Sequence, residues 1–155
     1  NNTLFGTDAF GYYETLGGGH GAVDGTHGAS GVHCHMSNTR ITDPEVFEHR
    51  FPVRLHRFAL REGSGGKGQF QGGAGVERLI EFLAPVSLSM LTQHRTEGPF
   101  GLHGGSSGAC GEQFITRADG TVDVLASSDG REIQVGDRLT VRTPGGGGWG
   151  TPQGG

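Results

Sequence analysis

The sequence predicts a mainly β fold, a glycine-rich sandwich or distorted barrel with one short helix, as part of a larger protein. Several short segments alternate apolar and polar residues, which is the period of a half-buried strand. Glycine supplies 32 of the 155 residues without the Gly-X-Y period of collagen, about three times its usual share of roughly 7%. Hydrophobic residues make up only 32%, which is low for an independent domain.

A glycine-rich loop over residues 16–31 leads into GVHCHMS (31–37), which alternates like a strand. One face of such a strand is expected to be core, and the other face is presented outward. The apolar face consists of Val32, Cys34 and Met36, and the polar face of His33, His35 and Ser37. We therefore interpret Cys34 as a buried structural thiol.

Residues 41–52 predict the short helix. Asp43 can cap its N-terminus, Pro44 suits the first helical position, and Glu45 lies in the first turn. Pro52 is expected to end the helix.

The strand predicted at residues 53–60 shifts its alternation, which indicates a bulge near His56–Arg57. After a glycine loop at 61–75, the strand at 76–83 is apolar on both faces near its end, so we expect one face to need a cover. The remaining expected elements are strands at 86–91 and 136–144 and a hairpin at 116–125 with its turn at Asp119-Gly120. Six or seven short strands result.

Composition excludes several classes of function. The net charge of -4 argues against binding to nucleic acid or to an anionic membrane surface. No apolar run approaches the roughly 20 residues that span a bilayer. Cys34 and Cys110 are the only cysteines, which predicts a cytoplasmic location rather than a disulfide framework.

The glycine runs do not predict a nucleotide site within this chain. Gly66-Lys67-Gly68 lacks the Ser or Thr that a phosphate loop needs after its lysine. Residues 17–22 fit G-x-G-x-x-A, but the strand–helix–strand context of a dinucleotide site is missing.

His33-x-His35 has two interpretations. Two imidazoles at i and i+2 of a strand point the same way, which suits a shared divalent metal. Further ligands would be needed, and the nearby candidates in the sequence are His20, Asp24, His27 and Asp43. The alternative is a pair of structural histidines bonded to loop backbone, so the metal ligands stay unknown.

Five arginines cluster within 22 residues: Arg40, Arg50, Arg54, Arg57 and Arg61. Guanidinium groups suit carboxylates and phosphates because they form paired hydrogen bonds. We expect Arg40 to bind a ligand and the others to form exposed or interface ion pairs.

Five motifs in order resemble the hydantoinase B/5-oxoprolinase family. They are GYYETLGGGHGA, GVHCHMSNTRITDPEVFEHRFPV, SGGKGQFQGGAGVER, PFGLHGGSSGACG and GDRLTVRTPGGGGWG. The resemblance covers residues 4–150, and NTRITDPEVFEHRFPV is most similar to the ATP-dependent 5-oxoprolinases. It implies that residues 1–155 are a fragment, the C-terminal portion of a hydantoinase B/oxoprolinase-like domain.

The resemblance also implies an activity and partners. A hydantoinase A-type domain or subunit, absent from this chain, would bind ATP and Mg²⁺ and phosphorylate the amide oxygen of a small lactam. The B-type portion would complete the opening of 5-oxo-L-proline to L-glutamate. A divalent metal in that portion would have its ligands mostly outside this chain, so we expect the isolated chain to be inactive. We also expect a homo-oligomer.

Within this reading, the segment after Gly31 becomes the candidate active site. We predict His33, His35 and Asn38 as catalytic residues, because histidine can act as general acid or base near neutral pH. Thr39 and Arg40 are predicted to bind the substrate, with Arg40 paired to its carboxylate. For the function of the chain, the alternatives to a 5-oxoprolinase are an N-methylhydantoinase or ketone carboxylase B-type subunit, or a non-catalytic assembly module.

Overall fold

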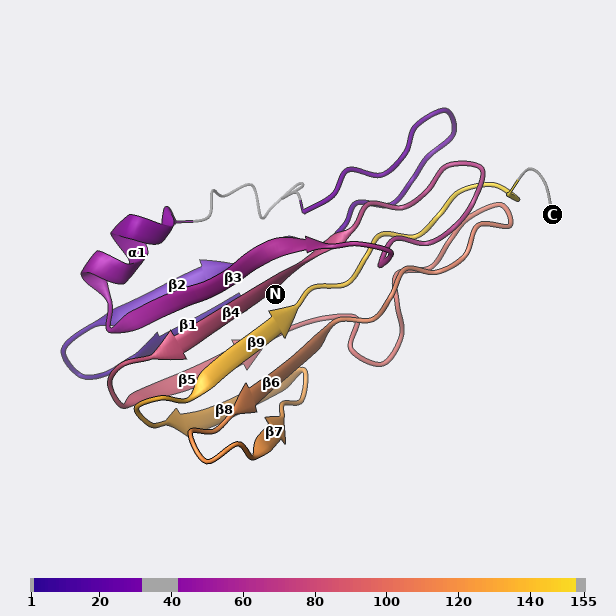
Figure 1. Cartoon of the computed structure of the whole chain (residues 1–155). Helices are drawn as coiled ribbons and strands as arrows, with labels where there is room; N and C mark the ends of the chain where they lie inside the picture. Colours follow the sequence, from indigo (N-terminus) through magenta and orange to yellow (C-terminus); the bar gives the residue numbers. More distant parts are fainter. Residues whose placement is uncertain (1, 32–41, 153–155) are drawn as a thin grey trace.

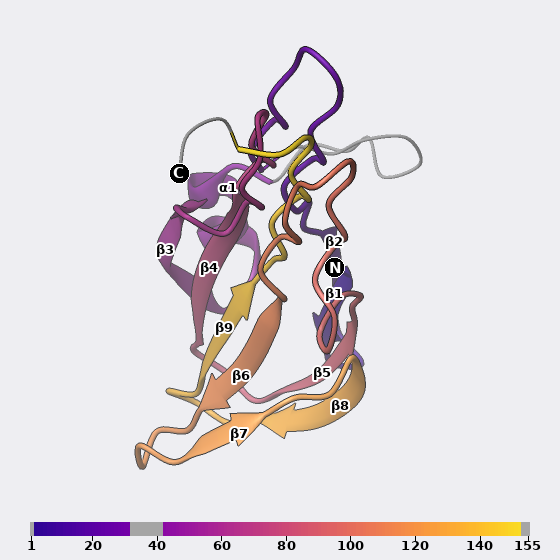
Figure 2. The same cartoon turned by 90° about the vertical axis from the view of Figure 1, so that its right-hand side faces the viewer.

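The computed structural model describes residues 2–31 and 42–152. These residues form two antiparallel β-sheets packed face to face, with one short helix beside them (Figures 1 and 2). The predicted mainly β fold is therefore confirmed, and of its two forms the structure is a sandwich. None of the helices in the described residues is long and apolar enough to cross a bilayer.

The smaller sheet has the strand order β2-β1-β5-β8, and the larger sheet has the order β3-β4-β9-β6-β7. The small-sheet strands are β1 (Asn2–Gly6), β2 (Gly11–Thr15), β5 (Val86–Leu91) and β8 (Ser128–Ile133). The large-sheet strands are β3 (Val53–Arg61), β4 (Gly75–Phe82), β6 (Glu112–Thr116), β7 (Val122–Val124) and β9 (Arg138–Arg142).

The helix α1 (Pro44–Arg50) forms for the reasons that the sequence indicates. The side chain of Asp43 accepts a hydrogen bond of 2.9 Å from the backbone N–H of Glu45, which satisfies one of the free donors of the first turn. Phe47 is the buried residue of the helix and anchors it to the core. The helix ends before Pro52, as predicted.

The predicted bulge in β3 is confirmed. The register between β3 and β4 shifts between Leu55 and Arg57, which leaves His56 as the extra residue. Because of this shift, Leu55 before the bulge and Phe58 after it both pair with inward-facing residues of β4.

The strands predicted at 76–83, 86–91 and 136–144 correspond to β4, β5 and β9. The hairpin predicted at 116–125 is formed by β6 and β7, but β6 lies almost wholly before the predicted range. The described residues contain nine strands rather than the six or seven expected. The sequence did not indicate β1, β2 or β8. Only Ile133 of β8 is buried, so that strand has no apolar alternation to detect. The strand predicted at 31–37 falls almost wholly outside the described residues.

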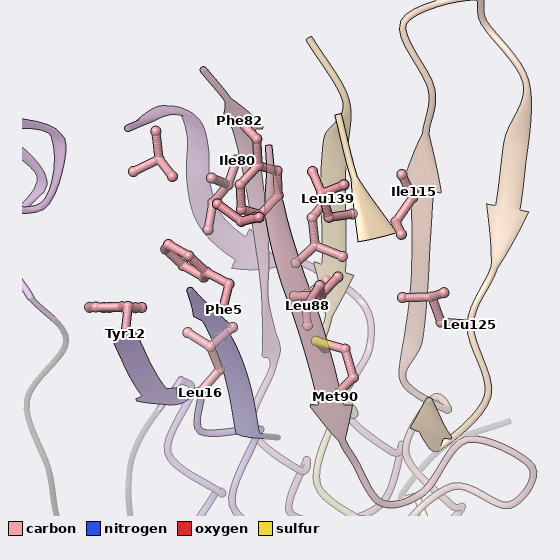
Figure 3. Close-up of a cluster of buried hydrophobic side chains, with 14 of the residues drawn as sticks. Phe5, Tyr12, Leu16, Ile80, Phe82, Leu88, Met90, Ile115, Leu125 and Leu139 are labelled. Atoms are coloured by element: carbon pink, nitrogen blue, oxygen red, sulfur yellow. The ribbon is translucent and has the colours of Figure 1, made fainter. Parts of the chain in front are cut away.

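The core lies between the two sheets (Figure 3). Phe5, Leu88 and Met90 reach it from the small sheet, and Ile80 and Leu139 from the large one. Near α1 the core becomes aromatic: the rings of Phe5, Tyr12, Phe47, Phe51 and Phe82 contact one another. Side chains from every layer thus share one hydrophobic cluster.

A buried carboxylate ties the β6–β7 hairpin to the loop before β9. Asp137 accepts hydrogen bonds from the backbone N–H groups of Gln134 and Ala118, and from Arg117, which also pairs with Asp123. Burial alone would raise the pKa of Asp137, but these hydrogen bonds outweigh it and hold the pKa below its ordinary value.

The lowered pKa of Asp137 predicts an acid-sensitive fold. Its contribution to stability is fully present above the ordinary pKa of 3.8, and is lost as the pH falls from there through the lower pKa of the folded state. We expect Asp137→Asn to lower the free energy of unfolding at pH 7 by about 1–3 kcal/mol. Urea unfolding of both proteins between pH 7 and pH 3 tests this. An equal dependence on pH in both would contradict it.

Candidate functional site

The residues that the sequence predicts as catalytic or substrate-binding lie outside the described residues: His33, His35, Asn38, Thr39 and Arg40. The same is true of Cys34, so its burial stays a prediction. The structure does place the residues on either side of this segment, Gly31 and Thr42. The contacts of these two residues show which parts of the fold hold the chain immediately before and after the undescribed residues.

Both neighbours are held by the sandwich. The backbone N–H of Gly31 donates to the carbonyl of Ala74 at 2.8 Å, and Ala74 N–H donates to the hydroxyl of Ser30 at 2.9 Å. On the other side, the hydroxyl of Tyr12 donates to Thr42 Oγ1 at 3.2 Å, one residue before the cap of α1. The two described residues next to the predicted site are therefore held by the glycine-rich segment that leads into β4 on one side, and by β2 just before α1 on the other.

The glycine-rich loops predicted from the sequence form a packed platform at one end of the sandwich, where several extended segments run side by side (Figure 1). Residues 144–149 lie at its centre and are almost entirely buried. Gly19 N–H donates to the carbonyl of Pro144, and Ala22 N–H donates to the carbonyl of Gly147. Donor and acceptor thus both advance by three residues from one hydrogen bond to the next.

The central segment turns once every three residues. A Cβ at Gly145 would meet the carbonyl of Ser64 and one at Gly148 that of Lys67, on the same neighbouring segment. A Cβ at Gly146 would meet His20 instead. Three residues per turn is the period of polyproline II helix, which has no internal hydrogen bonds and so bonds to its neighbours.

The loop around Lys67 does not have the free donors of a phosphate loop. A phosphate loop needs free backbone N–H groups that point at the phosphates. Here Gly66 N–H donates to the carbonyl of Gly146 at 2.8 Å, and Lys67 N–H donates to the hydroxyl of Ser106 at 2.7 Å. The glycines around Lys67 therefore serve backbone packing.

A buried ion pair joins the two sheets beside α1. Glu14 of β2 pairs with Arg78 of β4, and their side chains are only 5% and 1% exposed. The guanidinium of Arg78 also lies over the ring of Phe47, 4.8 Å from its centre. Burial lowers the pKa of Arg78 from its ordinary value. Tyr12, which bonds to Thr42, is the next inward residue of β2, so the strand that carries Glu14 also contacts the residue just before the cap of α1.

Sequence reasoning missed this pair, although a signal was present. Arg78 has the same phase as Val76, Ile80 and Phe82, and a charge on an otherwise apolar strand face needs a partner. Glu14 could not be identified as that partner, because β2 itself was not predicted.

A pocket of about 280 Å³ opens beside the platform. Its lining includes the backbone of Gly146–Gly148 and the side chains of His94, Pro99, Phe100 and Leu102. His94 has a positive φ of 55°, an uncommon conformation for a residue with a side chain. The pocket is mostly apolar with one imidazole, a composition that suits a small molecule or an apolar side chain.

Two of the four described arginines of the cluster form the expected ion pairs, whereas Arg50 and Arg54 form none with the described residues. Arg57 pairs with Glu77 at 2.8 Å, and Arg61 pairs with Glu112 at 3.4 Å. Arg40 falls outside the described residues. Within residues 2–31 and 42–152, no group of three or more His, Cys, Asp or Glu side chains is placed to hold a metal ion.

Comparison with known proteins gives consistent matches. The sequence profile of the hydantoinase B/oxoprolinase family matches residues 1–152. 5-Oxoprolinase 1 of Arabidopsis thaliana is 50% identical over 151 residues, covering 97% of this chain and 12% of that protein. The 5-oxoprolinase of Saccharomyces cerevisiae is 42% identical over 169 residues, covering 97% and 13%. The chain thus spans about an eighth of the length of these relatives.

Two solved structures share the fold. The ATP-dependent caprolactamase from Pseudomonas jessenii superposes with a TM-score of 0.80 at 23% identity, covering 97% of this chain and 28% of that chain. The nucleotide-free structure of acetone carboxylase superposes with a TM-score of 0.72 at 18% identity, covering 86% and 22%. At these identities the likeness establishes the fold alone.

Proposed function

The chain belongs to the hydantoinase B/oxoprolinase family of hydrolase-type enzymes, and from this we propose that it is the C-terminal portion of the B-type region of an ATP-dependent cyclic-amide hydrolase. We propose 5-oxo-L-proline as the substrate and L-glutamate as the product. The observation that carries the proposal is the 50% identity to a 5-oxoprolinase along 97% of the chain.

Nucleotide binding is proposed to lie outside this chain. The N–H groups of Gly66 and Lys67 are occupied within the platform, which supports a separate hydantoinase A-type domain or subunit as the holder of ATP and Mg²⁺. Any divalent metal of the B-type region would likewise take most of its ligands from elsewhere. A homo-oligomer and a cytoplasmic location stay predictions.

For the chemical step we propose the residues that the sequence singles out. His33, His35 and Asn38 would contact the reacting ring, with an imidazole as general acid or base. Arg40 would pair with the substrate carboxylate, and Thr39 would add a hydrogen bond. The described fold supports this by fixing Gly31 and Thr42, the residues on either side.

The test compares the full protein that contains this chain with the isolated chain. We expect the full protein to release L-glutamate and ADP from 5-oxo-L-proline and ATP, and the isolated chain to release neither. Glutamate formation by the isolated chain would overturn the placement of the nucleotide. A full protein that leaves 5-oxo-L-proline intact but carboxylates acetone would support the alternative function, that of a ketone carboxylase subunit. Acetone carboxylase, which shares this fold, represents that alternative.

In the full protein, we expect His35→Ala to lower turnover by about a hundredfold, a common contribution of general acid–base catalysis. Its effect on the midpoint of thermal unfolding should be small, since the predicted phase places His35 on the polar face of its strand. Cys34→Ser is the matched control and should show the reverse pattern. If His35→Ala unfolds the protein while its folded fraction keeps full activity, the phase assignment is wrong.

A further inference from the structure

We propose that the outer face of the small sheet is an interface on which the rest of the same protein packs through an apolar, uncharged surface. We call it the uncharged face and define it by the outward side chains of β1, β2 and β5. Its large members are Leu4, Tyr13 and Leu91.

The large side chains of this face are open to water in the described chain. Leu4, Tyr13 and Leu91 are 47%, 63% and 60% exposed, whereas the inward neighbours Phe5 and Tyr12 are buried. The strand register places Leu4 directly opposite Tyr13 on one side and Ser89 on the other. Leu91 is the next outward residue of β5 after Ser89. Leu4, Tyr13 and Leu91 therefore belong to one continuous surface across three strands.

The same three strands carry no charge on this face among their described outward positions, which are Leu4, Gly6, Gly11, Tyr13, Thr15, Ser87, Ser89 and Leu91. Charges appear at two margins of this face: Glu132 of the edge strand β8 accepts a hydrogen bond of 2.8 Å from the hydroxyl of Ser87, and the exposed Asp8 lies in the turn between β1 and β2. A hollow of about 410 Å³ lies over β1 and β5, and its lining is apolar or uncharged except for Asp8. Such a face loses little solvation of charge when another surface covers it.

The outer face of the large sheet has the opposite character. Arg142 pairs with Glu77 at 2.6 Å and with Glu112 at 2.9 Å, and Glu77 also pairs with Arg57. A second group joins Glu81 to Arg138 at 3.6 Å. Covering this network would require the desolvation of many charges, which commonly outweighs their attraction. Of the two outer faces, the uncharged face is therefore the one suited to burial.

The relatives indicate what covers it. The chain spans 12% of the plant 5-oxoprolinase and 28% of the caprolactamase chain that shares its fold, so most of each polypeptide lies outside this region. A surface on the same polypeptide is present at a high effective concentration, of the order of millimolar for short linkers, and outcompetes a free second copy. The occupant we infer is thus the remainder of the same protein. The sequence analysis expected an uncovered apolar face near the end of strand 76–83, where the structure has Leu79 half-buried and Leu83 43% exposed.

Site-specific photocrosslinking in the full protein tests this inference. p-Benzoylphenylalanine replaces Tyr13, an exposed position where an aromatic ring of similar shape leaves the fold intact. The matched control carries the same probe in place of Val124, which is 76% exposed on the outer face of the large sheet. We expect the probe at position 13 to crosslink to peptides of the same protein outside this chain, and the control to give at least tenfold less of that product.

Three outcomes would overturn the proposal. Crosslinks from position 13 only to a second copy of this chain would make the face an oligomer interface. Equal yields from positions 13 and 124, or no product from position 13, would show that the face is not selectively covered. The same probe in place of Leu91 repeats the measurement if the Tyr13 variant does not fold. These readouts need no enzymatic activity, so they stay separate from the test of the substrate.

Discussion

Gly146→Ala is expected to destabilise the chain by at least about 3 kcal/mol, the upper range for inserting one methyl group into a packed core. A Cβ at this position would lie 2.0 Å from the carbonyl oxygen of His20 and 2.7 Å from the N–H nitrogen of Gly21. Both obstacles are backbone atoms, so no side-chain rotation can relieve the contact. The two segments would have to separate.

Separation would also break hydrogen bonds that cross the platform. Gly146 N–H donates to the carbonyl of Gly73 at 2.9 Å, and the carbonyl of Gly146 accepts from Gly66 at 2.8 Å. Each buried group left unpaired adds a cost of about 1–3 kcal/mol. The prediction is measured by urea unfolding of the two proteins under identical conditions.

Gly21→Ala is the matched control. Gly21 lies in the same platform and faces the same central segment, but its nearest obstacle is the carbonyl of Gly147 at 3.9 Å, an ordinary contact. We expect its free energy of unfolding to change by less than about 1 kcal/mol. Similar losses in both variants would contradict the role of close packing, because Gly21 has no close contact and the reduced flexibility of the unfolded chain would by itself stabilise both variants.

The platform marks the boundary of what the sequence could predict. The signals for α1 and for the bulge in β3 are local: a cap residue, a proline, and a shift of phase within a few residues. The glycine segments were correctly placed outside the strands, but their packing was not foreseen. Gly146 contacts partners near residues 20 and 73, and glycine has no side chain whose pattern would reveal such pairing.

The same limit applies to the candidate site. The family resemblance rested on the order of long motifs, and it is confirmed by the match along residues 1–152. The individual roles of His33, His35 and Arg40 rested on alternation within one segment, and they stay predictions. Arg78 was visible as a charge on an apolar face, yet its partner Glu14 belongs to a strand 64 residues away.

The buried pair gives the second large effect. Arg78→Met should lower the free energy of unfolding by about 3–5 kcal/mol, because it leaves the carboxylate of Glu14 buried without a partner. Glu14→Gln should cost a similar amount, since it leaves the guanidinium of Arg78, which is 1% exposed, without its counter-charge. Neither group can turn to water, because both lie between the sheets.

The double variant Glu14→Leu with Arg78→Met separates two roles of the pair. If the charges serve mainly each other, removing both should cost clearly less than the sum of Arg78→Met and Glu14→Leu alone, with a coupling of at least about 2 kcal/mol. Leu and Met also fill the space beside Phe47 with apolar atoms, which replaces the desolvated charges by packing. Urea unfolding of the four proteins gives the cycle. Arg57→Met with Glu77→Leu is the control at the surface, where Arg57 is 61% exposed and Glu77 also pairs with Arg142, with an expected coupling below about 1 kcal/mol. Additive losses at the buried pair would show that Glu14 and Arg78 are each held by other contacts, and the ion pair would then not be what joins β2 to β4.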